Sequence, residues 1–251
     1  MKDLVVIKVG TGVLTRENGT LDGGSLVRLV TGIAELHASG QRCLLVSSGA
    51  VGAGVSALKL DAYPKKTAAR QAAAAVGQAR LMESYRTLFR QFDLNVAQLL
   101  LSGPDFQDNR KHVAATMTHL LDHPQIIPII NENDSVAVDE LRVGDNDMLS
   151  TKVAELMEAR LLILLTTVDG VLDRKGQLIE KAASVAELTD LIRGDESGKF
   201  SIGGMASKLK AVDYALSKGI EVVIANGRLP NQLPALAQNQ GSGTWFDAKV
   251  Q

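Results

Sequence analysis

Cysteine is nearly absent from this sequence, with one residue, Cys43, among 251. A single cysteine cannot form a disulfide within the chain, and the apolar run CLLV around it favours a buried small hydrophobe over a redox or nucleophilic group. No apolar run approaches the ~20 residues of a membrane-spanning helix, and Lys8 interrupts the first candidate for a signal-peptide core. We therefore expect a cytoplasmic protein.

An excess of charge of either sign is absent as well. Lysine and arginine together number 27 against 28 acidic residues, which gives a formal net charge of -1. This balance predicts no basic surface for nucleic acid or for an anionic membrane. An anionic ligand must therefore be bound by groups gathered at one place.

Metal-ligand clusters and nucleophilic triads are not indicated either. The histidines fall within or just after predicted helices, and they form neither a ligand pattern with the cysteine nor a Ser-His-Asp arrangement. We predict that they are structural and that protein side chains form no metal site. These histidines are His37, His112, His119 and His123.

The chain shows no internal division, because proline and glycine are scattered and no linker, fixed-period repeat or charge block occurs. Short apolar runs alternate with helical periodicity, beginning with a strand, a helix and a second strand in residues 4–50. This alternation predicts an α/β fold with a parallel sheet and right-handed crossovers. We therefore expect one continuous domain over residues 1–251, in which residues 193–204 suit a mobile loop.

Later elements follow the same alternation. The pattern predicts helices over residues 66–91 and 106–121 and a further helix from about Asn146. The stretch VLDRKGQLI is typical of a small hairpin, and SGTWFDA is typical of a strand at the edge of a sheet.

Glycine-rich and polar stretches follow the apolar runs. The first strand ends in KVGTG, the second in SSGAVGAG, and later ones in NEND and TTVDG. Ligands of open parallel sheets bind beyond the carboxyl ends of the strands, so we expect these stretches to meet at one site. Their glycines suit turns whose backbone N–H groups approach an anion, although each also suits an ordinary turn, and none matches a P-loop or dinucleotide fingerprint.

Two lysines occupy unusual positions. Lys8 lies within a strand that is apolar on both faces, and Lys208 lies in the first turn of a predicted helix, where its charge adds to the positive end of the dipole. A bound phosphate would relieve both conflicts; the alternative for Lys208 is a solvent-facing side chain after a hinge glycine pair. A carboxylate such as Asp134 or Asp147 could hold the lysines protonated, although Asp147 could equally be a helix cap.

Cations and amides without an evident general base favour one class of reaction. Phosphoryl transfer depends on positioning and on charge neutralisation. An acceptor that is already ionised at neutral pH, such as a carboxylate of pKa ~4, needs no base. The residues therefore suit transfer of a phosphoryl group to a carboxylate.

Six motifs together resemble the amino acid kinase family in their order and approximate spacing: VVIKVGTGVL, LLVSSGAVGAG, IIPIINENDSVA, VGDNDMLS, LLTTVDGVL and IGGMASKLKAV. Within that family, the chain is most similar to the branch that phosphorylates the side-chain carboxylate of L-glutamate in the first step of proline biosynthesis. The resemblance implies a three-layer sandwich with a mostly parallel central sheet and helices on both faces. It also implies the single-domain form, without the C-terminal RNA-binding-type domain that many members of this branch carry.

The resemblance implies roles for individual residues. Lys8 and Lys208 would stabilise the transferring phosphoryl group, and Asp147 would orient both lysines. The positions that would bind glutamate are Ser48, Asp134 and Asn146, with Asp134 as the partner of the α-ammonium group.

The same resemblance implies an ATP site. Magnesium would accompany ATP, with phosphates and water supplying most of its ligands, because the sequence indicates no cage of carboxylates. One position departs from the family pattern, which commonly has Asp where this chain has Thr167. The residues that would bind ATP are Lys8, Thr166, Thr167, Ile202, Gly203, Gly204, Met205, Ala206, Ser207 and Lys208.

Two alternatives stay open. One is another kinase of the family, acting on aspartate, N-acetylglutamate, carbamate or a nucleoside monophosphate; NENDSVA followed by GDND favours free glutamate. The other is a non-catalytic amino-acid or nucleotide sensor, which would have no need of Lys8, Asp147 and Lys208 together. From the family we also expect a homo-oligomer and inhibition by proline.

Overall fold

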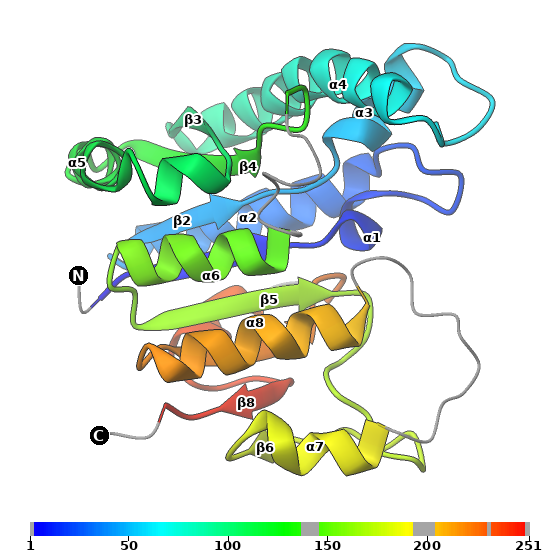
Figure 1. The fold of residues 1–251 in the computed structure, drawn as a ribbon. Coiled ribbons are helices and arrows are strands. Elements are labelled where there is room, and N and C mark those ends of the chain that lie inside the picture. The colour runs from blue at the N-terminus through cyan, green and yellow to red at the C-terminus, as the bar shows by residue number, and fades with distance from the viewer. Residues whose placement is uncertain (1–2, 137–145, 193–203, 230–231, 249–251) are drawn as a thin grey trace.

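The apolar runs form the strands of one eight-stranded sheet in the order β3-β4-β2-β1-β5-β7-β8-β6. This computed structural model describes residues 3–136, 146–192, 204–229 and 232–248. Figure 1 shows the sheet with helices on both faces. The strands are β1 (Val5–Val9), β2 (Cys43–Val46), β3 (Asn95–Leu101), β4 (Ile126–Glu132), β5 (Leu161–Thr166), β6 (Lys181–Ala182), β7 (Glu221–Asn226) and β8 (Thr244–Phe246).

The five central strand pairings are parallel, as the alternation of strands and helices predicted, and the antiparallel one joins β7 to β8. The expectation of a mostly parallel α/β sheet is therefore confirmed. The strand predicted in SGTWFDA is β8, but it is not the edge of the sheet, because the two-residue strand β6 pairs with it. A strand this short leaves no hydrophobic periodicity in the sequence, which is why it could not be predicted.

The helices divide into two layers. Helices α2, α4 and α9 pack on one face of the sheet, and α5, α6 and α8 pack on the other. Their bounds and those of the remaining helices are α1 (Thr11–Leu14), α2 (Gly23–Ala38), α3 (Ala50–Ala57), α4 (Thr67–Phe89), η1 (Arg90–Phe92), η2 (Gly103–Phe106), α5 (Arg110–Leu121), α6 (Asn146–Leu156), α7 (Val185–Ile192), α8 (Met205–Ser217) and α9 (Leu233–Ala237).

Alternate residues of β1 supply the two cores. Val5, Ile7 and Val9 join the cluster beneath α2 and α4, whereas Val6 joins the cluster beneath α6 and α8. Because side chains alternate along a strand, Lys8 faces the same layer as Val6. The lysine therefore lies on the side of the sheet that carries α6 and α8.

Several predicted elements differ in detail. The helix predicted over residues 106–121 begins at Arg110, after the separate 3-10 turn η2. The hairpin predicted in VLDRKGQLI is reduced to a single antiparallel bridge between Leu172 and Leu178. The SSGAVGAG stretch forms a full helix, α3, after the turn. The loop predicted at residues 193–204 lies almost wholly outside the described residues.

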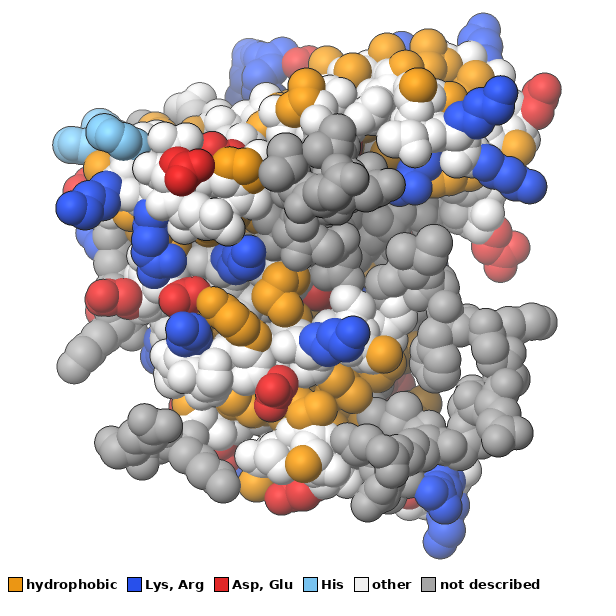
Figure 2. Space-filling view, in the orientation of Figure 1, with side chains coloured by type: hydrophobic (Ala, Val, Ile, Leu, Met, Phe, Trp, Pro, Cys, Tyr) orange, Lys and Arg blue, Asp and Glu red, His pale blue; other side chains and the backbone are white. Residues whose placement is uncertain are grey.

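The structure also bears on what the composition indicated about cysteine, membrane-spanning helices and surface charge. Cys43 is 1% exposed, and burial raises the pKa of its thiol to about 12, so the residue behaves as the small hydrophobe that its surroundings predicted. None of the described helices combines the length and apolar character needed to cross a membrane. On the face in Figure 2, Lys and Arg side chains are spread over several elements and do not form one basic patch.

Helices α3 and α4 touch backbone to backbone through two glycines. A Cβ atom on Gly77 would lie 1.8 Å from the carbonyl oxygen of Ala50, and a Cβ on Gly54 would lie 1.8 Å from that of Ala73. Glycine normally weakens a helix, so this close contact explains why it is present at both positions. The contact fixes α4 against the segment that follows β2.

We expect the Gly77→Ala variant to unfold at markedly lower denaturant concentration, with a loss of at least about 3 kcal/mol, because the new methyl group meets main chain that cannot move aside. Gly23→Ala is the matched control, since a Cβ there meets nothing within 4 Å. Urea titration followed by circular dichroism measures both. Equal stability of the two variants would contradict the proposed backbone contact.

Candidate active site

A pocket of about 560 Å³ lies beyond the carboxyl ends of the central strands. The structure brings most of the residues singled out in the sequence into this pocket: Lys8, Ser48, Asp134, Asn146, Asp147, Thr166, Thr167 and Lys208. Two predicted ATP-binding positions, Ile202 and Gly203, fall outside the described residues. Gly204, Met205, Ala206 and Ser207 are at the start of α8 but do not line the pocket.

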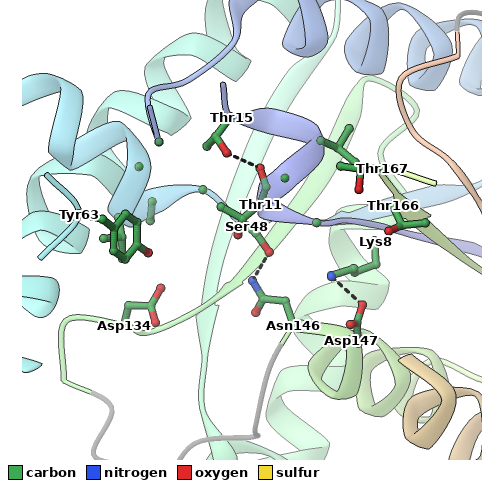
Figure 3. Close-up of a pocket in the computed structure, with 18 of the residues that line it drawn as sticks. Lys8, Thr11, Thr15, Ser48, Tyr63, Asp134, Asn146, Asp147, Thr166 and Thr167 are labelled. Atoms are coloured by element: carbon green, nitrogen blue, oxygen red, sulfur yellow. Dashed lines mark hydrogen bonds and ion pairs between the residues drawn. The ribbon is translucent and has the colours of Figure 1, made fainter. Parts of the chain in front are cut away.

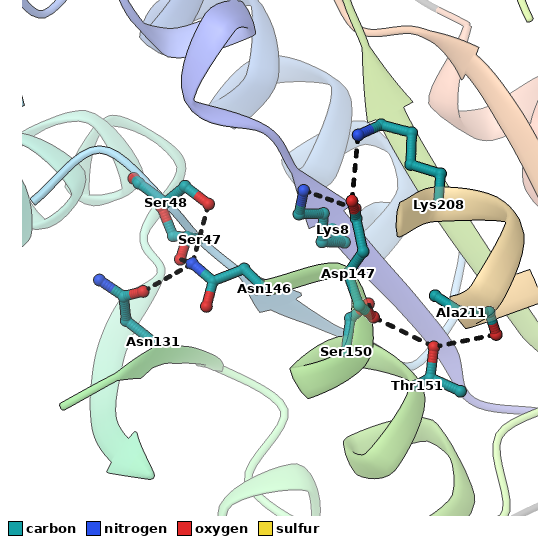
Figure 4. Close-up of polar contacts among 10 residues, drawn as sticks. All are labelled: Lys8, Ser47, Ser48, Asn131, Asn146, Asp147, Ser150, Thr151, Lys208 and Ala211. Atoms are coloured by element: carbon teal, nitrogen blue, oxygen red, sulfur yellow. Dashed lines mark hydrogen bonds and ion pairs between the residues drawn. The ribbon is translucent and has the colours of Figure 1, made fainter. Parts of the chain in front are cut away.

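Two buried lysines share one buried carboxylate. The Nζ atom of Lys8 lies 2.6 Å from Oδ1 of Asp147, and Nζ of Lys208 lies 3.0 Å from Oδ2 (Figure 4). The three side chains come from β1, α6 and α8, and they are 4%, 1% and 6% exposed for Lys8, Asp147 and Lys208. Asp147 lies in the first turn of α6, where the helix dipole favours a negative charge.

This arrangement has an excess of positive charge. Two ammonium groups and one carboxylate, all removed from water, leave one positive charge that no partner in the triad balances. All three side chains line the same pocket. A phosphoryl group entering there would be attracted by both ammonium groups.

The middle of the pocket is built around the amide of Asn146. Its Nδ2 lies 2.8 Å from the carbonyl oxygen of Ser47 and from Oγ of Ser48, and 2.9 Å from Oδ1 of Asn131, so its two hydrogens are shared among three acceptors. Asn146 begins α6 and therefore directly precedes Asp147. The amide is thereby fixed between the end of β2 and the end of β4.

The turn after β2 adds main-chain donors to the pocket. Gly49 has φ +99°, a left-handed conformation that glycine adopts without strain, and it leads directly into α3. The first N–H groups of a helix have no intrahelical acceptor, and residues 48–52 line the pocket. The N-terminus of α3 therefore presents amides to an anion beside Ser48.

The outer end of the pocket contains Tyr63, Arg70 and Asp134. Burial raises the pKa of the Tyr63 hydroxyl, Arg70 counteracts the increase and Asp134 adds to it, so the three groups lie within electrostatic reach of one another. Figure 3 shows Asn146 between Asp134 and the Lys8–Asp147 pair. Sequence reasoning missed Tyr63 and Arg70, because neither stands beside a strand end or in a recognisable motif.

Thr167 lies close to Gly12 of helix α1, which directly follows β1. A Cβ atom added to Gly12 would lie 3.1 Å from the Thr167 methyl carbon, so threonine at position 167 closely approaches the glycine-rich segment after β1. Thr166 ends β5 at the same rim of the pocket. Within the described residues, no three or more His, Cys, Asp or Glu side chains come together as a possible metal site.

The family model described as "Amino acid kinase family" matches residues 3–226. The chain belongs to the amino acid kinase family. Among curated members, it is 42% identical to the glutamate 5-kinase of Caldanaerobacter subterraneus subsp. tengcongensis over 251 residues, which cover 96% of this chain and 67% of that protein. It is 41% identical to the glutamate 5-kinase of Clostridium acetobutylicum, with 98% and 94% covered.

Two solved structures share the fold of this chain. The chain superposes on a Giardia carbamate kinase with a TM-score of 0.67 at 17% identity, covering 99% of both chains. It superposes on N-acetylglutamate synthase from Neisseria gonorrhoeae with a TM-score of 0.70 at 19% identity, covering 99% of this chain and 60% of the other. At these identities the likeness establishes the architecture and nothing about the substrate.

We expect Asp147→Asn to lower the free energy of unfolding by about 3 kcal/mol, because two buried ammonium groups lose their shared counter-charge. Asp108→Asn is the control, since it removes an exposed carboxylate. Thermal and urea unfolding of both variants give the comparison. A variant at position 147 that is as stable as the control would show that Asp147 does not neutralise the lysines.

Proposed function

We propose that this chain is a glutamate 5-kinase, which transfers the γ-phosphoryl group of ATP to the side-chain carboxylate of L-glutamate and yields γ-glutamyl phosphate. The observation that carries the chemistry is the buried Lys8–Asp147–Lys208 arrangement, which holds two ammonium groups beside the pocket where they can stabilise a transferring phosphoryl group. The acceptor is supported by curated glutamate 5-kinases at about 40% identity over nearly the full chain.

The reaction is an in-line displacement at the γ-phosphorus. A carboxylate oxygen of glutamate attacks, the bond from phosphorus to the bridging oxygen breaks, and ADP leaves with the electron pair of that bond. Because the acceptor is already ionised, no side chain has to remove a proton, and no histidine is among the residues that line the pocket. Catalysis then consists of positioning and of charge neutralisation by Lys8 and Lys208.

Asp147 would act on the lysines and not on the substrate. Its two carboxylate oxygens each face a different ammonium group, which fixes both Nζ atoms beside the pocket. ATP would enter beside Thr166 and Thr167, with the start of α8 along its phosphates. These assignments follow from the resemblance, and the pocket that Thr166, Thr167 and Lys208 line supports those three of them.

Magnesium fits this site as an ion carried by ATP. The carboxylate nearest the reaction centre, Asp147, is already occupied by two lysines, so the described side chains supply no cage of acidic ligands. Magnesium commonly retains water and binds substrate phosphates, and bound in that way it would neutralise charge on the nucleotide.

Glutamate would lie along the Ser48, Asn146 and Asp134 side of the pocket. Its γ-carboxylate would point to the lysines, and its α-ammonium group would face Asp134 at the other end. A free ammonium group is what an acidic side chain recognises, which disfavours an N-acylated acceptor. A homo-oligomer and inhibition by proline stay predictions from the family resemblance, and a cytoplasmic location stays a prediction from the composition.

We expect the purified protein to form a hydroxamate from glutamate with ATP, magnesium and hydroxylamine, because hydroxylamine traps an acyl phosphate. Aspartate and N-acetylglutamate should give little product: the first is one methylene shorter, and the second lacks the ammonium group. Colorimetric detection of the iron complex measures all three. Product from another acid alone would leave the chemistry intact but overturn the acceptor, and no product from any acid would overturn the proposed reaction.

We expect Lys8→Met and Lys208→Met each to reduce kcat by about 10²–10³-fold, since each removes one charge that stabilises the transition state. Lys210→Met is the matched control, because Lys210 is exposed on the same helix as Lys208. Steady-state rates and melting temperatures are measured together. Near-normal turnover in a folded variant would remove that lysine from the catalytic centre.

A further inference from the structure

Helix α4 makes two polar contacts with the strand ends that form the glutamate side of the pocket. Gln78 accepts a hydrogen bond from Nδ2 of Asn131 at 2.9 Å, and the Tyr85 hydroxyl lies 2.8 Å from Oγ of Ser47. Gln78 and Tyr85 are seven residues apart, which places them on the same face of the helix about two turns apart. Neither residue lines the pocket.

The contact through Gln78 has a fixed direction. The backbone N–H of Glu132 can only donate, and it donates to Asn131 at 2.9 Å, so the atom that accepts must be Oδ1. Asn131 therefore has Nδ2 on its other side, where Gln78 provides the acceptor. Asn131 is 1% exposed, so a lost partner would leave a buried amide unsatisfied.

The orientation of the Asn146 amide follows from the same kind of argument. The carbonyl oxygen of Ser47 can only accept, so the atom 2.8 Å from it must be Nδ2 of Asn146, and the same nitrogen faces Oδ1 of Asn131. Oδ1 of Asn146 then points away from both, as Figure 4 shows. No residue in the described part of the chain donates a hydrogen bond to this oxygen, and Asn146 lines the pocket.

The hydrogen bond between Tyr85 and Ser47 acts on Asn146 through the main chain of Ser47. Ser47 gives its hydroxyl hydrogen to the carbonyl oxygen of Ser48, so the Tyr85 hydroxyl must be the donor to Ser47 Oγ. Both Tyr85 and Ser47 are fully buried. This chain of hydrogen bonds holds the main chain after β2, whose Ser47 carbonyl in turn holds Asn146.

We propose that Gln78 and Tyr85 are positioning residues for the amino-acid acceptor, acting through Asn131 and Ser47 to keep Oδ1 of Asn146 turned toward the α-ammonium group of glutamate. The proposal rests on the proposed function. The backbone contact between Gly77 and α3 fixes the position of α4 relative to the segment after β2. The side chains of Gln78 and Tyr85 therefore reach their partners from a helix that is held in place. The site is thereby selective for acids with a free, protonated amine.

The decisive comparison is between Gln78→Met, which removes the acceptor, and Gln78→Glu, which retains it. We expect Gln78→Met to raise the KM for glutamate about tenfold, the effect of one lost hydrogen bond, with kcat within twofold, because the ammonium group is remote from the reacting carboxylate. Gln78→Glu should restore a KM near that of the unaltered chain. Gln91→Met is the control for an exposed glutamine near the end of the same helical segment.

A second readout separates positioning from general distortion. Glutarate has both carboxylates of glutamate but no ammonium group, so its inhibition constant against glutamate should be unchanged in Gln78→Met. Tyr85→Phe should raise the KM for glutamate about threefold by the same route and should also leave the inhibition constant of glutarate unchanged. Tyr214→Phe is its control, since Tyr214 donates an equally short hydrogen bond, 2.9 Å, to Glu155 outside the pocket.

The possible results distinguish failure of the positioning role from failure of the proposed function. An unchanged KM in folded Gln78→Met and Tyr85→Phe, or an equal weakening of glutamate and glutarate, would overturn the positioning role. If Gln78→Met does not fold, as judged by its melting temperature, Tyr85→Phe decides alone. Absence of turnover by the unaltered chain with glutamate would overturn the proposed function together with this inference, whereas an active chain with unaffected variants would overturn the inference only.

Discussion

The carboxylate of Asp147 is the group on which the site depends, because it allows two ammonium groups to be buried side by side. Without it, Lys8 and Lys208 would repel each other as two buried like charges. Asp147 contacts both at hydrogen-bonding distance and lies where the dipole of α6 favours its own charge. The two ammonium groups are thereby held together beside the pocket.

The sequence was most informative where one residue contradicted its neighbours. Lys8 stands out in an apolar strand and Lys208 at the start of a helix, so both could be selected without any structure. The apolar runs likewise predicted the parallel sheet, because strands buried on both faces do not alternate. The common location of the polar stretches followed from a rule of topology that holds for open parallel sheets in general.

Other features could not be found in the sequence, for physical reasons that differ between them. Helix α3 contains glycines, which disfavour a helix, but the backbone contact with α4 outweighs that preference. Gln78 and Tyr85 look like ordinary helical residues, because their partners lie 53 and 38 positions away along the chain. Arg70 and Tyr63 reach the pocket only through the packing of α4 and the segment before it.

Lys8 also has a consequence for how the chain selects its native strand alignment. In the observed register, Lys8 lies beside Val46 of β2 and Leu164 of β5, and its side chain faces the layer that contains Asp147. If β1 slipped by one residue, every side chain would move to the opposite face, and the ammonium group would enter the entirely apolar cluster beneath α2 and α4. A slipped sheet would then bury an unpaired charge. Lys8 therefore also favours a single register for the central strand.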